Sequence, residues 1–182
     1  LNSVVTGSAT TFTSSSGGVL DDMSSSYGGG IYATSSTTVT LSSGSLIHNC
    51  SVLGSGGGIV ALYNSYFQLQ STTMTACWAT SSGGGAALGA SSTGWFDDDS
   101  LVSNCYAYSG SGGGVAVLNL GSTDDEDWIL VTDSKIDGCS ATTYGGAMSS
   151  AASGTLLFAT GSTISNSSAP RATTTESPIS NT

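Results

Sequence analysis

A glycine cluster that recurs along the chain constrains the fold more than any other feature of the sequence. Triplets begin at Gly28, Gly56, Gly83 and Gly112, and Gly145-Gly146-Ala147 forms a fifth copy. The starting positions are therefore 28, 27, 29 and 33 residues apart. A period of this length is typical of solenoids, in which each repeat buries its apolar residues only by stacking on the next repeat.

Each repeat also contains two short apolar blocks. One resembles Ile47-His48-Asn49-Cys50, and the other alternates, as in Val39-Thr40-Leu41. Gly, Ser, Thr and β-branched residues dominate, which disfavours helix. We therefore expect an all-β fold, namely a right-handed, single-stranded parallel β-helix of about six coils of 27–33 residues, with three short strands per coil. A β-sandwich also uses short strands, but it gives no reason for glycine triplets at a fixed period.

Stacked coils lie about 4.8 Å apart, so equivalent residues form continuous inward rows. The predicted rows are Ile31/Ile59/Ala86/Val115/Met148, Ile47/Met74/Val102/Ile136/Ile164 and Leu41/Leu69/Phe96/Val131/Phe158. We assign residues 1–169 to the β-helix. Residues 170–182 form a Ser/Thr/Pro-rich tail, which we expect to pack on a neighbouring subunit.

The alternation of a Gly-Gly-(Gly/Ala)-apolar motif with an apolar-x-x-Asn motif resembles the repeat of polymorphic outer membrane proteins and similar β-helix surface proteins of microbes. The resemblance extends over most of residues 20–169. Leu46 and Leu101 replace the usual Phe, and Ala76 and Gly138 stand where Asn is expected. The resemblance implies an exported surface protein and supplies no catalytic residues.

Charge narrows the range of partners. The chain has 12 acidic and 2 basic residues, giving a formal net charge of -10. Lys135 and Arg171 alone cannot neutralise a row of phosphates, so we expect neither nucleic acid nor anionic membrane surfaces as partners. No apolar run reaches the roughly 18 residues of a membrane span.

Four cysteines share one position in successive repeats and should therefore form a stack. They are Cys50, Cys77, Cys105 and Cys139. A buried column of thiols is one interpretation, and the disulfides Cys50–Cys77 and Cys105–Cys139 are the other. The sequence separation of the cysteines disfavours zinc.

Three asparagines, Asn49, Asn104 and Asn166, precede the cysteine position or its equivalent. Their amides can satisfy backbone groups of the turn. Asn49 and Asn166 also begin N-x-Ser sequons, and Asn166 is the stronger glycosylation candidate.

Seven of the twelve acidic residues lie in two groups, Asp97-Asp98-Asp99 and Asp124-Asp125-Glu126-Asp127. Solvated loops are the favoured interpretation. Asp97, Asp98 and Asp99 are weak candidates for a calcium site, and no other cofactor is expected. Catalysis of the polysaccharide lyase or hydrolase type is disfavoured, since Lys135 is the only base near these acids and His48 lies in a different block.

The alternating strand of each repeat should present an outward stripe. Thr40, Gln68, Trp95, Leu130 and Leu157 follow one another in it, flanked by Tyr66 and Trp128. An apolar stripe on the outside of a rod marks a contact surface. We call Tyr66, Trp95, Trp128, Leu130 and Leu157 the contact face.

These features lead us to expect a non-enzymatic structural protein, extracellular or on the cell surface, whose subunits associate laterally and end to end into a filament, appendage or surface layer. An adhesin or carbohydrate-binding module is the alternative, and a polysaccharide-active enzyme is the second alternative.

Overall fold

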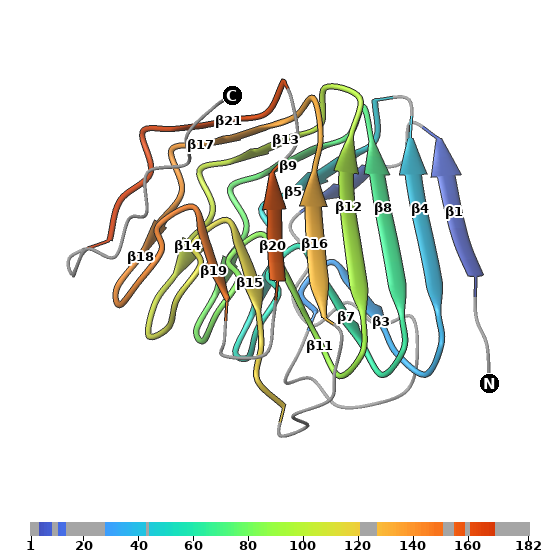
Figure 1. Ribbon diagram of the computed structural model, residues 1–182, viewed down its shortest axis with the longest axis horizontal. Helices are drawn as coiled ribbons and strands as arrows, with labels where there is room; N and C mark the ends of the chain where they lie inside the picture. Colours follow the sequence, from blue (N-terminus) through green and yellow to red (C-terminus); the bar gives the residue numbers. More distant parts are fainter. Residues whose placement is uncertain are drawn as a thin grey trace.

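The computed structural model describes residues 4–8, 11–13, 28–42, 44–120, 127–150, 155–158 and 161–169. This part of the chain contains strands β1 to β21 and no helix, so no helix in it could cross a membrane. The strands stack in parallel as four sheets along the molecule (Figure 1). The expected all-β parallel solenoid is therefore confirmed.

Each sheet collects one strand from each successive turn of the chain. Sheet 1 contains β1 (Val4–Ser8), β4 (Thr38–Ser42), β8 (Tyr66–Gln70), β12 (Thr93–Asp97), β16 (Trp128–Val131) and β20 (Thr155–Phe158). Sheet 2 contains β2 (Thr11–Thr13), β5 (Leu46–His48), β9 (Thr73–Thr75), β13 (Leu101–Ser103), β17 (Lys135–Asp137) and β21 (Thr163–Ser165). Sheet 3 contains β6 (Ser51–Val52), β10 (Trp78–Ala79), β14 (Tyr106–Ala107) and β18 (Ser140–Ala141). Sheet 4 contains β3 (Ile31–Ala33), β7 (Ile59–Leu62), β11 (Ala86–Gly89), β15 (Val115–Val117) and β19 (Met148–Ser150).

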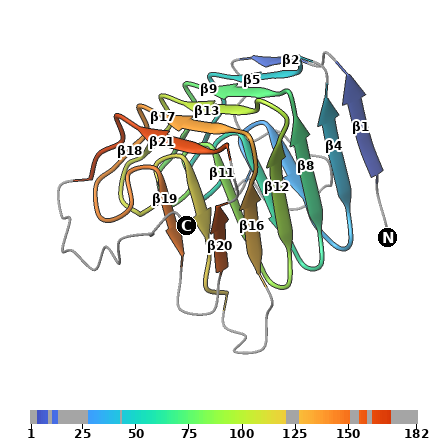
Figure 2. The same cartoon turned by 45° about the horizontal axis from the view of Figure 1, so that its top comes forward.

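The chain visits sheets 4, 1, 2 and 3 in turn, and sheet 2 lies across the top of the molecule in Figure 2. Four complete turns result: β3–β6, β7–β10, β11–β14 and β15–β18, with β1–β2 and β19–β21 as partial turns. The prediction of three strands per coil is wrong, because each complete turn has four. The additional strands, those of sheet 3, have two residues each, too few for a recognisable alternation in the sequence.

The strand pairing places the three predicted inward rows in register. Ile31 pairs with Ile59, and Ile47 pairs with Met74, with Leu41 opposite Leu69 in sheet 1. The register continues through the later turns without a slip. Nearly all row members with described side chains are buried, as part of one apolar core. Ile164 at the end of its row is an exception, with 49% of its surface exposed.

The glycine triplets allow the backbones of neighbouring turns to approach closely. In the second triplet Gly56 has a φ of 76°, a left-handed conformation that L side chains disfavour. A Cβ on Gly57 would overlap the carbonyl oxygens of Gly84 and Trp78 in the next turn. A Cβ on Gly58 would lie 2.8 Å from the carbonyl oxygen of Gly85. Each triplet therefore lies where no side chain fits.

Strands β3, β7, β11 and β15 of sheet 4 are buried on both faces, which the repeat pattern did not predict. Its outward side chains Tyr32, Val60 and Ala87 form a second apolar cluster, against which Leu118 packs. Leu118 lies in the longer connection between β15 and β16. Asp124, Asp125 and Glu126 of that connection, together with Leu1 and residues 170–182, lie outside the described residues. The docking of the tail on a neighbouring subunit therefore stays a prediction.

Asp127 corrects the expectation of a solvated acidic group. Its side chain is 2% exposed, and its Oδ1 accepts a hydrogen bond of 2.8 Å from the Ser92 backbone N–H. On the previous turns Ser92 and Ser65 play the same part, because their hydroxyls accept from the N–H groups of Ser65 and Thr37. Asp127 thus ends a buried polar row at the corner between sheets 4 and 1.

Candidate functional site

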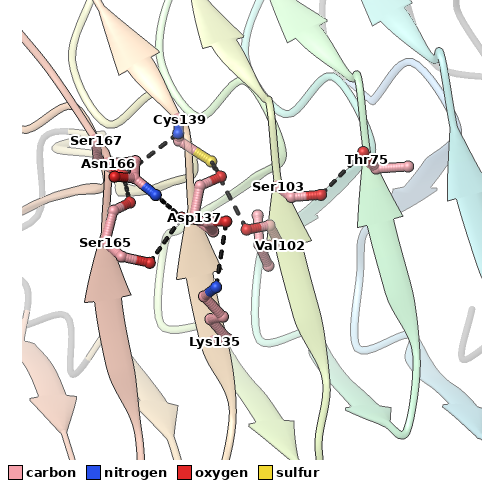
Figure 3. A network of polar contacts seen from close by, with 9 residues as sticks. All are labelled: Thr75, Val102, Ser103, Lys135, Asp137, Cys139, Ser165, Asn166 and Ser167. Atoms are coloured by element: carbon pink, nitrogen blue, oxygen red, sulfur yellow. Dashed lines mark hydrogen bonds and ion pairs between the residues drawn. The ribbon is translucent and has the colours of Figure 1, made fainter.

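A polar row runs across the outer surface of sheet 2 (Figure 3). His48, Thr75, Ser103, Asp137 and Ser165 occupy equivalent positions on successive strands. The Ser103 hydroxyl donates to Thr75 Oγ1 over 2.9 Å, and the Ser165 hydroxyl donates to Asp137 Oδ1 over 2.6 Å. Side-chain hydrogen bonds therefore link neighbouring turns as the backbone pairing does.

Asp137 is the centre of this row and gathers donors from two turns. Besides Ser165, Asn166 Nδ2 donates to its Oδ1 over 2.9 Å, and Lys135 Nζ lies 3.2 Å from its Oδ2. The hydrogen bonds from Ser165 and Asn166, followed by that from Lys135, lower the pKa of the Asp137 carboxyl, because they stabilise its charged form. The Asp137 carboxylate therefore joins two neighbouring turns at the surface through its contacts with Ser165, Asn166 and Lys135.

The three predicted asparagines lie at one left-handed turn between sheets 2 and 3. Asn49, Asn104 and Asn166 have φ values of 53°, 51° and 51°. Ala76 and Gly138, which depart from the motif, adopt φ values of 55° and 62° at the same position. The motif is thus explained by backbone conformation, since Asn and Gly tolerate this region best.

Asn166 and Asn49 are both exposed, as a sequon requires. The Nδ2 atom of Asn166, to which a glycan would be attached, is the atom that donates to Asp137. Glycosylation of Asn166 stays a prediction.

The four cysteines form the predicted column. All are buried thiols, each directly before a strand of sheet 3. Cys77 contacts the thiols of Cys50 and Cys105, and Cys105 also contacts Cys139. Contact with the Cys139 and Cys77 thiols, together with burial, raises the pKa of Cys105. The disulfides Cys50–Cys77 and Cys105–Cys139 join neighbours in this column and stay an alternative prediction.

The contact face lies on the outer surface of sheet 1. Trp95 pairs with Leu130, and Leu130 pairs with Leu157, so these three are adjacent on successive strands. Trp128 lies on the strand of Leu130, whereas Tyr66 is two strands away from it, with Thr93 between them. Tyr66, Trp95, Trp128 and Leu130 are half-buried. The described apolar side chains of this surface therefore lie on β8, β12 and β16, and the side chain of Leu157 on β20 lies outside the described part of the structure.

Two side chains of the contact face, Trp95 and Tyr66, have unusual surroundings. The indole Nε1 of Trp95 is buried and has no hydrogen-bond partner in the described part of the chain. Burial, followed by the charge of Asp97, raises the pKa of Tyr66.

The Asp97-Asp98-Asp99 group forms the turn between sheets 1 and 2. Asp98 Oδ2 accepts from Gln70 Nε2 over 2.6 Å, and Asp97 Oδ1 accepts from the Asp98 backbone N–H over 2.9 Å. Asp98 and Asp99 have φ values of 45° and 61°. No group of three or more His, Cys, Asp or Glu side chains among the described residues is arranged to hold a metal ion.

One cluster was not predicted from the sequence. Trp78, Tyr106 and Tyr108 meet on the outer surface of sheet 3, and we call them the aromatic cluster. The ring centroids of Trp78 and Tyr108 are 5.4 Å apart, and those of Tyr106 and Tyr108 are 4.4 Å apart, with near-perpendicular ring planes. Its sequence signal is the pattern Cys-aromatic-Ala at Cys77 and Cys105, where one outward residue lies between two inward ones.

Comparison of the chain with protein-family models, with curated proteins and with solved structures finds no match. The resemblance to polymorphic outer membrane proteins therefore stays an expectation from the motifs.

Proposed function

We propose that this chain is a non-enzymatic, exported structural protein whose β-solenoid subunits associate end to end and laterally into an extracellular filament, appendage or surface layer. The proposal includes a right-handed coil, the hand that parallel β-strand crossovers almost always take. The proposal also includes about six turns, a number that counts the partial turns at both ends.

The exposed end of the core carries the proposal. Ile164 continues the inward row of Ile47, Met74, Val102 and Ile136, yet it is 49% exposed, whereas Ile136 is 1% exposed. In the described part of the chain, β20 and β21 are edge strands of sheets 1 and 2. An apolar row that ends at an open sheet edge favours continuation by another chain.

The opposite end offers a complementary edge. Strands β1 and β2 are the other edge strands of sheets 1 and 2, and β1 and β20 lie at opposite sides of sheet 1 (Figure 1). Docking of the first turn, which includes Val4 and Val5, on the last turn of the next molecule would extend both sheets. Such a head-to-tail contact does not close, so it generates a filament. The tail at 170–182 would then lie along the neighbouring subunit.

The end-to-end contact is tested by Ile164→Asp. A carboxylate in the buried contact would lose its hydration without a partner, so we expect the assembled species to be replaced by monomers in sedimentation velocity. Thr163→Asp, on the exposed neighbouring position of β21, adds the same charge and serves as the control. We expect a smaller loss of assembly in the control. Equal assembly of the Ile164→Asp chain and the unmodified chain would refute the contact.

Lateral association is assigned to the contact face. Replacing Trp95 and Leu130 together with Ser removes its apolar centre, so we expect the circular dichroism spectrum to be retained and lateral bundles to be lost. Tyr144→Ser is the control, since Tyr144 is 51% exposed in the connection between β18 of sheet 3 and β19 of sheet 4, outside sheet 1. Bundles of unchanged width from the double variant would contradict this role.

A further inference from the structure

The aromatic cluster lies on sheet 3, a surface that the proposed self-association does not use. Trp78 and Tyr106 are outward residues of β10 and β14, and Tyr108 follows β14 with 54% of its surface exposed. Tyr108 makes edge-to-face contacts with both other rings. These contacts hold the rings in place before a ligand arrives, which reduces the entropy that binding must overcome.

Hydroxyl groups border the rings on both sides. Strand pairing places Ser51, Trp78, Tyr106 and Ser140 in one outward row. The backbone hydrogen bonds after these strands place Leu53, Thr80, Tyr108 and Thr142 in the next outward row. The surface thus places adjacent aromatic rings beside hydroxyl groups that carry no formal charge.

The described charges lie elsewhere. Lys135, Asp137 and the acidic residues of the described chain belong to sheets 1 and 2 or to connections that border them. Sheet 3 therefore has no described cation for an acidic ligand, and the net charge of the chain repels anions.

A pocket of about 340 Å³ lies next to the cluster, at the corner between sheets 3 and 4. Two of its lining residues follow the aromatic cluster closely in the sequence. Ser82 is four residues after Trp78, and Ser111 is three residues after Tyr108. Its polar side chains are Ser82, Ser111, Asn119, Tyr144, Ser149 and Ser150, all of them uncharged. Its volume falls within the usual range of ligand pockets.

We propose that the aromatic cluster and the adjoining pocket bind a neutral carbohydrate chain. Sugar rings combine apolar C–H faces, which stack on aromatic rings, with hydroxyl edges, which exchange hydrogen bonds with Ser, Thr, Asn and Tyr side chains. Both kinds of group are present here without charges. The surface is distinct from the contact face on sheet 1, so this inference does not depend on the proposed self-assembly.

The test is titration of the full chain with neutral hexasaccharides, namely cellohexaose, chitohexaose, xylohexaose and mannohexaose, followed by calorimetry and tryptophan fluorescence. We expect at least one to bind, and hexagalacturonate, an anionic control, not to bind. Trp78→Ala and Tyr108→Ala should each weaken binding about tenfold. Tyr63→Ala removes an exposed tyrosine outside the site and should leave the affinity unchanged.

Three results would overturn the proposal. They are the absence of binding to all four neutral oligosaccharides at millimolar concentration, equal binding of hexagalacturonate, or an unchanged affinity of both aromatic variants whose circular dichroism spectra match that of the unmodified chain. Loss of subunit assembly in Trp78→Ala without any sugar binding would identify the cluster as a contact between copies instead.

Discussion

At the scale of single residues, one backbone position explains both the asparagine motif and its exceptions. Asn49, Ala76, Asn104, Gly138 and Asn166 all have φ between 51° and 62° on successive turns. Ala76 has neither the freedom of glycine nor an amide to form local hydrogen bonds. The left-handed region costs an ordinary L residue about 1–2 kcal/mol, so this turn is under strain at Ala76.

Ala76→Asn should therefore stabilise the protein by about 1 kcal/mol, and Asn104→Ala on the next turn should destabilise it by about the same amount. Urea unfolding followed by circular dichroism measures both changes. The reciprocal pair is its own control, because the two positions have similar φ values, 55° and 51°. Destabilisation by Ala76→Asn would show that the asparagine pattern does not reflect backbone conformation.

The sequence predicted which residues occupy equivalent positions on successive turns. It did not predict which side chains those residues contact. Equivalent spacing predicted the cysteine column, because a solenoid maps one repeat position onto one line along its axis. The burial of Asp127 was not predicted, because a run of acidic residues usually indicates a solvated loop. Only the structure shows that Asp127 continues the buried row formed by Ser65 and Ser92. The donors that surround Asp137 come from a different repeat, and spacing alone does not show which way side chains turn.

At the scale of elements, the glycine triplets determine how closely the turns stack. The second glycine of a triplet, such as Gly57, has no room for a side chain between the backbones of its neighbours. Those neighbours are backbone carbonyl groups of Gly84 and Trp78, and the backbone hydrogen bonds of both residues to other turns prevent them from moving away. An added methyl group must therefore separate the turns.

Gly57→Ala should destabilise the protein by about 3 kcal/mol, the upper part of the range for overpacking. Gly44→Ala is the matched control, since a Cβ there meets nothing within 4 Å although its φ is 78°. We expect a loss of about 1 kcal/mol for the control, from backbone conformation alone. Both are measured by urea unfolding. Equal losses for the two variants would mean that close approach of the turns is not what the triplets provide.

The three longer strands of each turn were predictable, and the fourth was not. Sheets 1, 2 and 4 follow apolar blocks of three to five residues, which repeat with the glycine triplets. The strands of sheet 3 are defined by pairing with neighbouring turns rather than by a pattern of their own. The aromatic cluster lies on that sheet and was missed for the same reason. The burial of the outer face of sheet 4 depends on a packing partner, Leu118, in a connection outside the repeat.

At the scale of the whole molecule, the surfaces are divided by chemistry. Sheet 1 presents the contact face, sheet 2 presents a polar row with Asp137 and Lys135, and sheet 3 presents the aromatic cluster. The ends expose sheet edges, and at the C-terminal end Ile164 leaves the core row uncovered. The proposed lateral contact, axial contact and carbohydrate binding therefore involve different surfaces and are compatible with one another.

Electron microscopy of the unmodified protein, negatively stained at increasing concentration, tests the central claim most directly. We predict filaments whose length grows with concentration and whose axial repeat equals the height of one subunit. Dispersed single particles at every concentration, from a preparation with the circular dichroism spectrum of a β protein, would contradict the proposed end-to-end assembly.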